Sequence, residues 1–453
     1  MTYKYEILEQ LQKYSKKDKT RLHIPGHKNN KEFRKAFPVA PFDITELDFS
    51  DDLSCPDGVI KKAQSDLAEI LGAKKTYITT DGSTSGVMAM VFVAAQYGTK
   101  LIVPRNSHKS VYNACRVMNI EPVIVQGSEE EGILTPPPPD LIETLIVNDV
   151  SIAGMIVASP DYFGNIAPLE DYAHILKKYD RFLFVDGAHG AHLALEEGRV
   201  NYAGRYADMW VDGAHKTLPT LSQGAIVCVN DDHLMNIADA AMAIFRTSSP
   251  SYPIMASVEY GVKYLYNNPR TLRKAKAAAL LLQSELSSFK LYLSADWTKL
   301  SIDFKPLGID PELVASQLRK QGIYPEMVSG RYIMFYFSPM TEQSHVNQLK
   351  NLLLKICSQK KLQNTYKGLP PVYDTDRTYS FLYAHKSKSE LVPIEDAVGR
   401  MAADNAGIQP PSLPVIVAGE IITLQAIAVI KRARKTFGIT DGKIRVVADY
   451  GEI

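Results

Sequence analysis

Cysteine is scarce in this sequence: there are four among 453 residues, and they lie far apart. No Cys-x-x-Cys pair is present and no histidine lies at metal-ligand spacing from a cysteine, so we expect reduced thiols and no metal site. Long hydrophobic runs are missing too, and residues 1–19 are polar where a signal peptide would have an apolar core. We therefore expect a cytoplasmic protein that does not enter a membrane.

Neither sign of charge is in excess. The 51 basic and 50 acidic residues give a net charge of +1, so no overall field attracts nucleic acid or a membrane surface. Hydrophobic residues make up 45% of the chain and charged residues 22%, which is typical of a globular protein. The length allows two or three domains, and a small molecule is the expected ligand.

Short apolar segments alternate with helix-forming segments through the first half of the chain. This alternation is typical of a mostly parallel sheet that is covered by helices on both faces. The sequence therefore predicts an α/β large domain over residues 51–268. Its seven predicted strands are residues 76–80, 101–103, 122–125, 154–158, 181–186, 209–212 and 225–229.

Three further parts are expected around the large domain. Residues 1–50 are predicted to form an N-terminal arm, and residues 269–365 a small α+β domain that begins with a long helix. Residues 366–453 are predicted to form a C-terminal subdomain, preceded by a polar linker over residues 358–379. In this subdomain we expect helices over residues 394–403 and 421–437 and a terminal strand over residues 443–448.

A lysine follows the sixth predicted strand. Residues 210–219 pass from an apolar strand through a small-residue turn to Lys216, at the strand end where open α/β sheets place their chemistry. A desolvated lysine stays partly neutral, and a neutral amine can form a Schiff base with a carbonyl. For a single lysine, a solvated loop is the more common explanation, so the interpretation depends on three other stretches.

Those stretches also follow predicted strands. Asp186 could hold a ring nitrogen protonated, because a nearby anion favours the cationic form, although a helix cap is an alternative. Ser83 and Thr84 lie in a small-residue turn before a helix, where hydroxyls and free backbone N–H groups suit a phosphate. The turn is neither a Walker loop nor a Gly-x-Gly-x-x-Gly fingerprint. His108 could stack on a heteroaromatic ring.

In this chain order, the four features resemble the large domain of the fold-type I pyridoxal phosphate enzymes and, within them, the bacterial ornithine/lysine/arginine decarboxylase family. The resemblance covers nearly the whole chain. It is carried by residues 22–28, 51–60, 105–110, 186–192, 214–219, 247–253, 397–400, 410–411 and 419–420. Large inducible members have an added N-terminal regulatory domain, and this chain is similar to the shorter branch.

The resemblance implies a role for each candidate residue. Lys216 is expected to join pyridoxal 5′-phosphate as a Schiff base, Asp186 to pair with the ring nitrogen, and His189 to lie at the reactive edge in an orienting or protonating role. His108 would stack on the ring, while the phosphate would be bound by Ser83, Thr84, His215 and, from a neighbouring subunit, Ser248. A homodimer is therefore the smallest expected active unit.

Three positions depart from the family pattern. The family usually has a serine, a phosphate ligand, where this chain has Gly213, and an acidic residue where it has Gly187. Asp161 replaces the more usual threonine or asparagine. The first departure removes one expected hydrogen bond to the phosphate, and the last bears on substrate preference.

The expected reaction is decarboxylation of arginine, lysine or ornithine to an amine of polyamine biosynthesis. Asp161 and Glu420 are the candidate partners for the distal cation of the substrate. Another pyridoxal phosphate reaction on the same scaffold, such as transamination or lyase chemistry, is an alternative, since the fold does not fix the reaction. A second alternative is a protein that binds the cofactor but catalyses no reaction.

Overall fold

The computed structural model describes residues 2–16, 20–359, 362, 364–366, 379–409 and 412–448. Within these ranges, no helix combines the length and apolar character needed to cross a membrane. The same ranges contain no cluster of His, Cys, Asp or Glu side chains arranged to bind a metal ion.

A seven-stranded sheet forms the centre of the molecule, with the strand order β1-β9-β8-β7-β6-β2-β3. Five neighbouring strands are parallel, and β9 runs antiparallel to both β1 and β8. The predicted mostly parallel sheet is thus confirmed, and each predicted strand overlaps an observed one. The strands are β1 (Lys75–Thr79), β2 (Lys100–Pro104), β3 (Glu121–Val125), β6 (Ile152–Ala158), β7 (Phe182–Gly187), β8 (Met209–Asp212) and β9 (Ala225–Val229).

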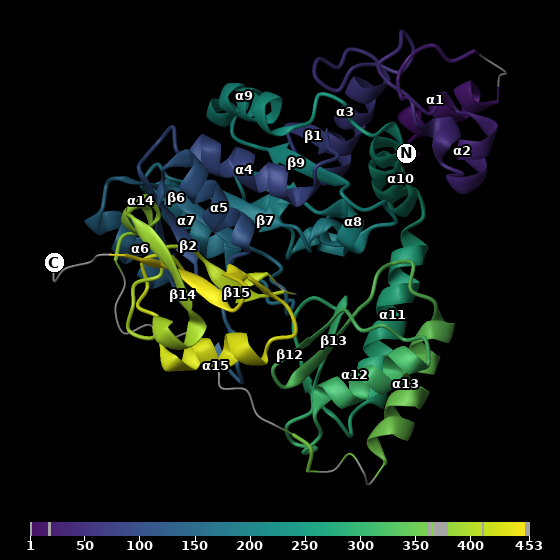
Figure 1. Cartoon of the computed structure of the whole chain (residues 1–453). Helices are drawn as coiled ribbons and strands as arrows, with labels where there is room; N and C mark the ends of the chain where they lie inside the picture. The colour runs from purple at the N-terminus through teal and green to yellow at the C-terminus, as the bar shows by residue number, and fades with distance from the viewer. Residues whose placement is uncertain are drawn as a thin grey trace.

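Helices cover both faces of this sheet (Figure 1). In β2, Leu101 and Val103 pack on one face and Ile102 on the other, as the two-residue period of a strand requires. The first face is covered by α4 (Gly82–Ala94), α5 (Lys109–Met118) and α9 (Met235–Phe245). The opposite face is covered by α3 (Val59–Leu71), α6 (Pro139–Asn148), α7 (Leu169–Lys178) and α10 (Tyr252–Asn267).

The N-terminal arm is hydrogen-bonded to α10 through the buried carboxylate of Glu259. Helix α1 (Glu6–Ser15) packs on α3 and α10, and its first N–H groups donate to Glu259 at 2.6 to 3.3 Å. The ammonium group of Lys263 donates to Glu259 and to Asp66, both at 2.8 Å. These bonds satisfy the free N–H groups at the start of α1. The arm also contains α2 (Lys31–Ala36), which the sequence did not predict.

The small unit is a four-stranded sheet with helices packed on it. The strand order is β10-β11-β13-β12, and all neighbours are antiparallel. The expected α+β pattern is present. The elements are α11 (Pro269–Glu285), β10 (Lys290–Tyr292), β11 (Lys299–Asp303), α12 (Pro311–Lys320), β12 (Met327–Ser329), β13 (Tyr332–Tyr336) and α13 (Gln343–Cys357).

The C-terminal unit, coloured yellow-green to yellow in Figure 1, differs from the prediction in two places. The helix predicted over residues 394–403 is wrong: a single 3₁₀ turn at Ile394–Ala397 ends before Gly399, which has a φ of +81°. The helix predicted over residues 421–437 is α15 (Leu424–Arg432) only. After it, Phe437 pairs with Gly407, so the chain becomes a strand there. The other elements are α14 (Phe381–Lys386), β14 (Ser389–Pro393), β15 (Ala406–Ile408), β16 (Leu413–Ile416), β17 (Thr436–Phe437), β18 (Ile439–Thr440) and β19 (Lys443–Val447).

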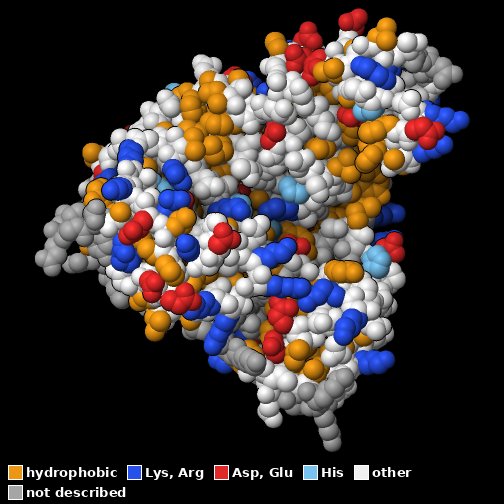
Figure 2. Space-filling model, in the orientation of Figure 1, with side chains coloured by type: hydrophobic (Ala, Val, Ile, Leu, Met, Phe, Trp, Pro, Cys, Tyr) orange, Lys and Arg blue, Asp and Glu red, His pale blue; other side chains and the backbone are white. Residues whose placement is uncertain are grey.

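Most of the predicted linker over residues 358–379 lies outside the described residues. The proposed division into an arm, a large domain, a small domain and a C-terminal subdomain stays a prediction. On the face shown in Figure 2, Lys and Arg side chains gather where the C-terminal unit approaches the small unit. A groove of about 940 Å³ lies between these units, and Glu326 and Arg434 are among its lining residues.

Candidate active site

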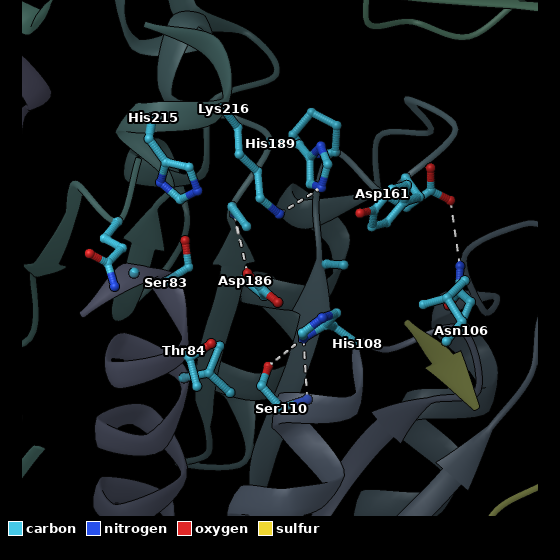
Figure 3. A pocket seen from close by; sticks show the side chains of 18 of the residues that line it. Ser83, Thr84, Asn106, His108, Ser110, Asp161, Asp186, His189, His215 and Lys216 are labelled. Carbon is cyan, nitrogen blue, oxygen red and sulfur yellow. Dashed lines mark hydrogen bonds between the residues drawn. The ribbon is translucent and has the colours of Figure 1, made fainter. Parts of the chain in front are cut away.

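A cavity of about 440 Å³ opens at the carboxyl ends of the parallel strands, where open α/β sheets bind their ligands (Figure 3). It collects side chains from stretches that are far apart in the sequence. Seven of the eight predicted site residues line it: Ser83, Thr84, His108, Asp186, His189, His215 and Lys216. The exception is Ser248, which is exposed and is not among the described lining residues. Its neighbour Thr247 donates from its backbone N to Asp81 Oδ2 at 3.2 Å, just before the first residue of α4.

Lys216 lies in the short helix α8 (Ala214–Thr217) after β8. Its Nζ atom is 3.1 Å from His189 Nε2, and it lies over the ring of Tyr162 at 5.7 Å from the ring centroid. Burial lowers the pKa of Lys216, while the charges of Asp186 and Glu326 act in the opposite direction. The amine is therefore easier to deprotonate than a solvated lysine, which suits a nucleophile.

Asp186 is the residue before the last one of β7, and it is buried and lines the cavity. Burial raises the pKa of its carboxyl group, although the charge of Lys216 and the hydrogen bond from Ala188 N, at 3.2 Å, oppose this. A buried carboxylate with few hydrogen bonds is stabilised by a cation beside it. A protonated ring nitrogen would be such a partner.

Ser83 is the second residue of α4 and lines the same cavity. Its Oγ atom is buried and has no hydrogen-bond partner among the described residues, so a polar group is expected to occupy the space beside it. The N-terminus of α4 adds the positive end of the helix dipole. His215 Nδ1 donates to Gly224 O at 2.9 Å, which leaves its other nitrogen available. These groups fit a phosphate.

The structure accounts for both glycine departures. A Cβ atom at Gly213 would lie 2.3 Å from Ala188 O and 2.9 Å from Ser83 Oγ, so a serine does not fit there without a shift. The hydroxyl of Ser83 therefore stands beside the position where the family has its serine. A Cβ atom at Gly187 would lie 3.0 Å from Asp212 Oδ1. The buried Asp212, whose pKa is raised to about 7 by burial, thus supplies an acid next to position 187 from the neighbouring strand.

His108 precedes α5, and its Nδ1 atom accepts a hydrogen bond from Ser110 N at 3.2 Å. Burial, followed by the charges of Lys216 and Lys109, lowers the pKa of His108 to about 4. The ring is therefore neutral near pH 7, and a neutral flat ring is suited to stacking on another aromatic ring.

The low pKa of His108 predicts a loss of stability in acid. In the unfolded chain, the pKa of His108 returns to its ordinary value of 6.5. Between pH 6.5 and about 4, the imidazole is therefore protonated in the unfolded chain and neutral in the folded one. This contribution to the free energy of unfolding is lost as the pH falls through that interval. The free energy of unfolding is expected to fall between about pH 7 and about pH 4.5 in both proteins. In His108→Asn, this fall is expected to be about 2 kcal/mol smaller than in wild type.

The measurement is urea denaturation of both proteins at the two pH values. The exposed His174 on α7 provides the matched control, His174→Asn. Equal pH dependence in wild type and His108→Asn would show that the folded ring takes up its proton at an ordinary pH.

Neither predicted partner of the distal cation is available for that role. Asp161 lines the cavity, but its carboxylate already accepts from Phe163 N and Asn165 N, at 2.8 and 2.9 Å, and from Asn165 Nδ2 at 2.9 Å. Glu420 forms a buried ion pair with Arg105, at 3.0 Å between Arg105 Nη2 and Glu420 Oε2. Three donors thus occupy the carboxylate of Asp161, and a guanidinium group occupies that of Glu420.

The small unit brings residues to the site that no sequence motif predicts. The hydroxyl group of Tyr336, in β13, lies 2.8 Å from His189 Nδ1. Glu326, just before β12, lies near enough for its charge to raise the pKa values of Lys216 and Tyr162. Both residues follow Lys216 by more than a hundred positions, and no motif marks them. Tyr162, which follows β6 and lines the cavity, carried a local signal as part of a polar turn after a strand.

The residues of the cavity fit pyridoxal phosphate. Lys216 would hold its aldehyde carbon, Asp186 its ring nitrogen, and the N-terminal end of α4 its phosphate, where the buried Ser83 Oγ has no hydrogen-bond partner in the described part of the chain. His108, His189 and His215 complete the lining around them. When bound, the cofactor supplies an electron-accepting ring conjugated to the group that is attached at its aldehyde carbon.

Two models of one protein family match this chain. Residues 6–281 match the Orn/Lys/Arg decarboxylase major domain, and residues 360–436 match the C-terminal domain of the same family. The chain is 28% identical to an arginine decarboxylase of Bacillus subtilis over 457 residues, which cover 93% of this chain and 91% of that protein.

Two solved structures show the same fold. A lysine decarboxylase of Francisella novicida superposes with a TM-score of 0.81 at 17% identity, covering 97% of this chain and 80% of the other. A serine palmitoyltransferase of S. paucimobilis with bound PLP gives a TM-score of 0.54 at 15% identity, covering 65% of this chain and 75% of the other. The chain therefore belongs to the Orn/Lys/Arg decarboxylase family and is a pyridoxal phosphate-dependent carboxy-lyase with a fold-type I large domain.

Proposed function

We propose that the protein decarboxylates arginine and releases agmatine, with Lys216 as the residue that binds the cofactor. The observation that carries this proposal is that one cavity brings together a partly buried lysine amine, a buried aspartate and the N-terminus of α4, where Ser83 Oγ is buried with no hydrogen-bond partner among the described residues. Arginine is favoured among the basic amino acids because relatives that match over nine-tenths of the chain at 26 to 28% identity bear the name arginine decarboxylase.

Glu326 is the acid that we assign to the distal cation of the substrate. It is exposed on the wall of the groove beside the cavity, and its charge acts on Lys216. In the described part of the chain, its carboxylate forms no ion pair, so it can accept the two parallel hydrogen bonds of a guanidinium group. Asp161 would then shape the cavity rather than bind the cation.

The residues of the chain have separate tasks in this reaction. Lys216 would supply a neutral amine, and Asp186 would keep a proton on the ring nitrogen of the cofactor. The cavity walls would hold the substrate in one rotamer, and this orientation would select the bond to the carboxylate as the one that breaks. His189, beside Lys216 Nζ, can take or return a proton at Nε2.

The active unit is proposed to be at least a homodimer, with Ser248 reaching the phosphate of the neighbouring subunit. The exposed position of Ser248 outside its own cavity agrees with this proposal. We also propose that the protein acts in the cytoplasm.

The test measures CO₂ and amine release from arginine, lysine and ornithine in parallel, with added pyridoxal phosphate. Arginine is expected to give the highest kcat/KM. In Glu326→Gln, KM for arginine is expected to rise roughly tenfold with little change in kcat, because a charge-assisted hydrogen bond worth about 1.5 kcal/mol is lost.

A control removes another acid of the same groove, Glu312→Gln, and is expected to leave KM unchanged. Amine from lysine or ornithine only would replace the substrate assignment, and formation of a keto acid would indicate transamination. Bound cofactor with no product from any substrate would contradict the proposed activity.

A further inference from the structure

A tight turn just before β9 borders the cavity. Gly224 N donates to Leu221 O at 3.2 Å, which closes a turn of four residues. The two central residues, Ser222 and Gln223, are exposed and line the cavity. Helix α10 supports the turn from behind, because Leu221 N donates to Ser257 Oγ at 3.1 Å. The turn is thus a fixed part of the cavity wall.

The turn is bonded to both elements that carry the candidate phosphate ligands. Gln223 O accepts from Gly82 N, in the first residue of α4, at 2.8 Å. Gly224 O accepts from His215 N at 3.1 Å and from His215 Nδ1 at 2.9 Å. Because a carbonyl oxygen can only accept, these hydrogens are directed to the turn and not into the cavity. The turn therefore holds the start of α4 and His215 in place, and it occupies hydrogen-bond donors at this end of the cavity.

Gln223 has a backbone conformation that is unusual for a glutamine. Its φ is +75°, at the third position of the turn, where glycine or asparagine is the ordinary residue. A side chain at positive φ strains the backbone, and strain of this kind is concentrated at functional sites. A glycine would form the same turn without strain. Backbone geometry alone therefore does not account for a glutamine at this position.

The side chain of Gln223 is available to a ligand. Within the described part of the chain, its carboxamide forms no hydrogen bond, and the residue lines the same cavity as Ser83, whose buried Oγ atom also has no partner there. In Figure 3, Ser83 and His215 lie on the side of the cavity away from Asp161. The turn reaches this side through its bonds to Gly82 and His215. A carboxamide nitrogen carries two hydrogens, which suits the acceptor oxygens of a phosphate.

We propose that Gln223 is a further cofactor-binding residue, whose carboxamide N–H donates to the phosphate of pyridoxal phosphate beside Ser83. This inference rests on the proposed function, because it takes the phosphate to lie at the N-terminus of α4. The turn then has two tasks. Its carbonyl groups hold α4 and His215, and the side chain of Gln223 supplies a donor to the ligand. Because the phosphate is negatively charged, this hydrogen bond is stronger than one between neutral groups.

The test compares two ligands that differ only in the phosphate. Equilibrium dialysis of the full-length protein gives the Kd for pyridoxal 5′-phosphate and for pyridoxal. In Gln223→Gly, the Kd for pyridoxal 5′-phosphate is expected to rise about 10- to 100-fold, the loss of one charge-assisted hydrogen bond, whereas the Kd for pyridoxal is expected to stay the same. In Gln223→Glu, the side chain keeps its length but its charge repels the phosphate, so a larger rise is expected.

Asp441→Gly is the matched control for the change of backbone. Asp441 has a φ of +50° in the turn between β18 and β19, and it is not among the described residues that line the cavity. It is expected to leave both Kd values unchanged. Urea denaturation is expected to show that Gln223→Gly is as stable as wild type, because the relief of strain offsets the greater freedom of glycine in the unfolded chain.

An unchanged Kd for pyridoxal 5′-phosphate in Gln223→Gly would overturn the proposal. An equal rise for both ligands would also overturn it, because it would indicate a distorted turn. Ser83→Ala, which is expected to raise only the Kd for pyridoxal 5′-phosphate, reports on the phosphate position itself. If neither variant changes that Kd, the placement of the phosphate at α4 fails together with the role of Gln223. If no substrate is decarboxylated, the proposed function fails while the Kd values still decide this role.

Discussion

Replacement of Lys216 by alanine is expected to lower kcat for CO₂ release by about 10⁴- to 10⁶-fold, the range found when a covalent nucleophile is removed. The reason lies in the placement of its amine, which is desolvated, 3.1 Å from His189 Nε2 and in the same cavity as Asp186. The variant is expected to fold normally and to bind the cofactor only reversibly. Amine release measures the activity, and gel filtration after borohydride treatment measures covalent attachment.

Lys109→Ala is the matched control for this experiment. Lys109 lies next to His108, but its Nζ atom stands over the ring of Phe437 at 5.0 Å from the ring centroid. Its loss changes the charge near the site without removing a group that we assign to the cofactor. Covalent attachment that persists in Lys216→Ala would contradict the assignment and direct attention to Lys299, the buried lysine beside Tyr336.

Glu420→Gln is expected to have the largest effect on stability, a loss of about 3–5 kcal/mol in the free energy of unfolding. Glu420 and Arg105 are only 3% and 4% exposed, and Glu420 Oε2 also accepts from Val417 N at 2.7 Å. Removing the negative charge leaves a guanidinium group that is buried without a counter-charge. The pair joins the C-terminal unit to the loop before His108, so activity is expected to fall together with stability. Urea denaturation of the cofactor-loaded protein measures the effect.

Two comparisons make this measurement specific. Arg105→Met combined with Glu420→Leu removes both charges and is expected to recover much of the loss, because no unpaired ion remains. Glu390→Gln breaks an exposed pair of the same C-terminal unit, with Arg400 at 2.7 Å, and is expected to cost at most about 1 kcal/mol. A Glu420→Gln effect as small as that of Glu390→Gln would show that water reaches Arg105.

The sequence predicted the large sheet because its strands are marked locally. Each strand is a short apolar run that ends in polar or small residues. Because both faces of the sheet are buried, nearly every position in a strand must be hydrophobic. Lys216, Asp186, Ser83 and His108 follow such runs, and parallel strands bring their carboxyl ends to one edge of the sheet. Their gathering in one cavity was predictable for this reason.

Where local signals were weak, the prediction was wrong. Residues 394–403 have a helical spacing of apolar side chains, yet Gly399 takes a positive φ and Met401 and Ala402 form isolated β-bridges. Residues 433–437 leave the predicted helix because Thr436 and Phe437 pair with β15. In both places, contacts with strands that are distant in sequence outweigh the periodicity.

By itself, the sequence determined the fold class, the family and the residues that follow the central strands, because these depend on local patterns of burial and on contiguous motifs. Only the tertiary structure decided which carboxylates already have hydrogen-bond or ion-pair partners. It also placed Ser83 next to Gly213 and Asp212 next to Gly187. It brought Tyr336 and Glu326 to the site. Such pairings depend on distances between elements that lie far apart in the chain. No single segment encodes those distances, because they arise when two units pack against each other.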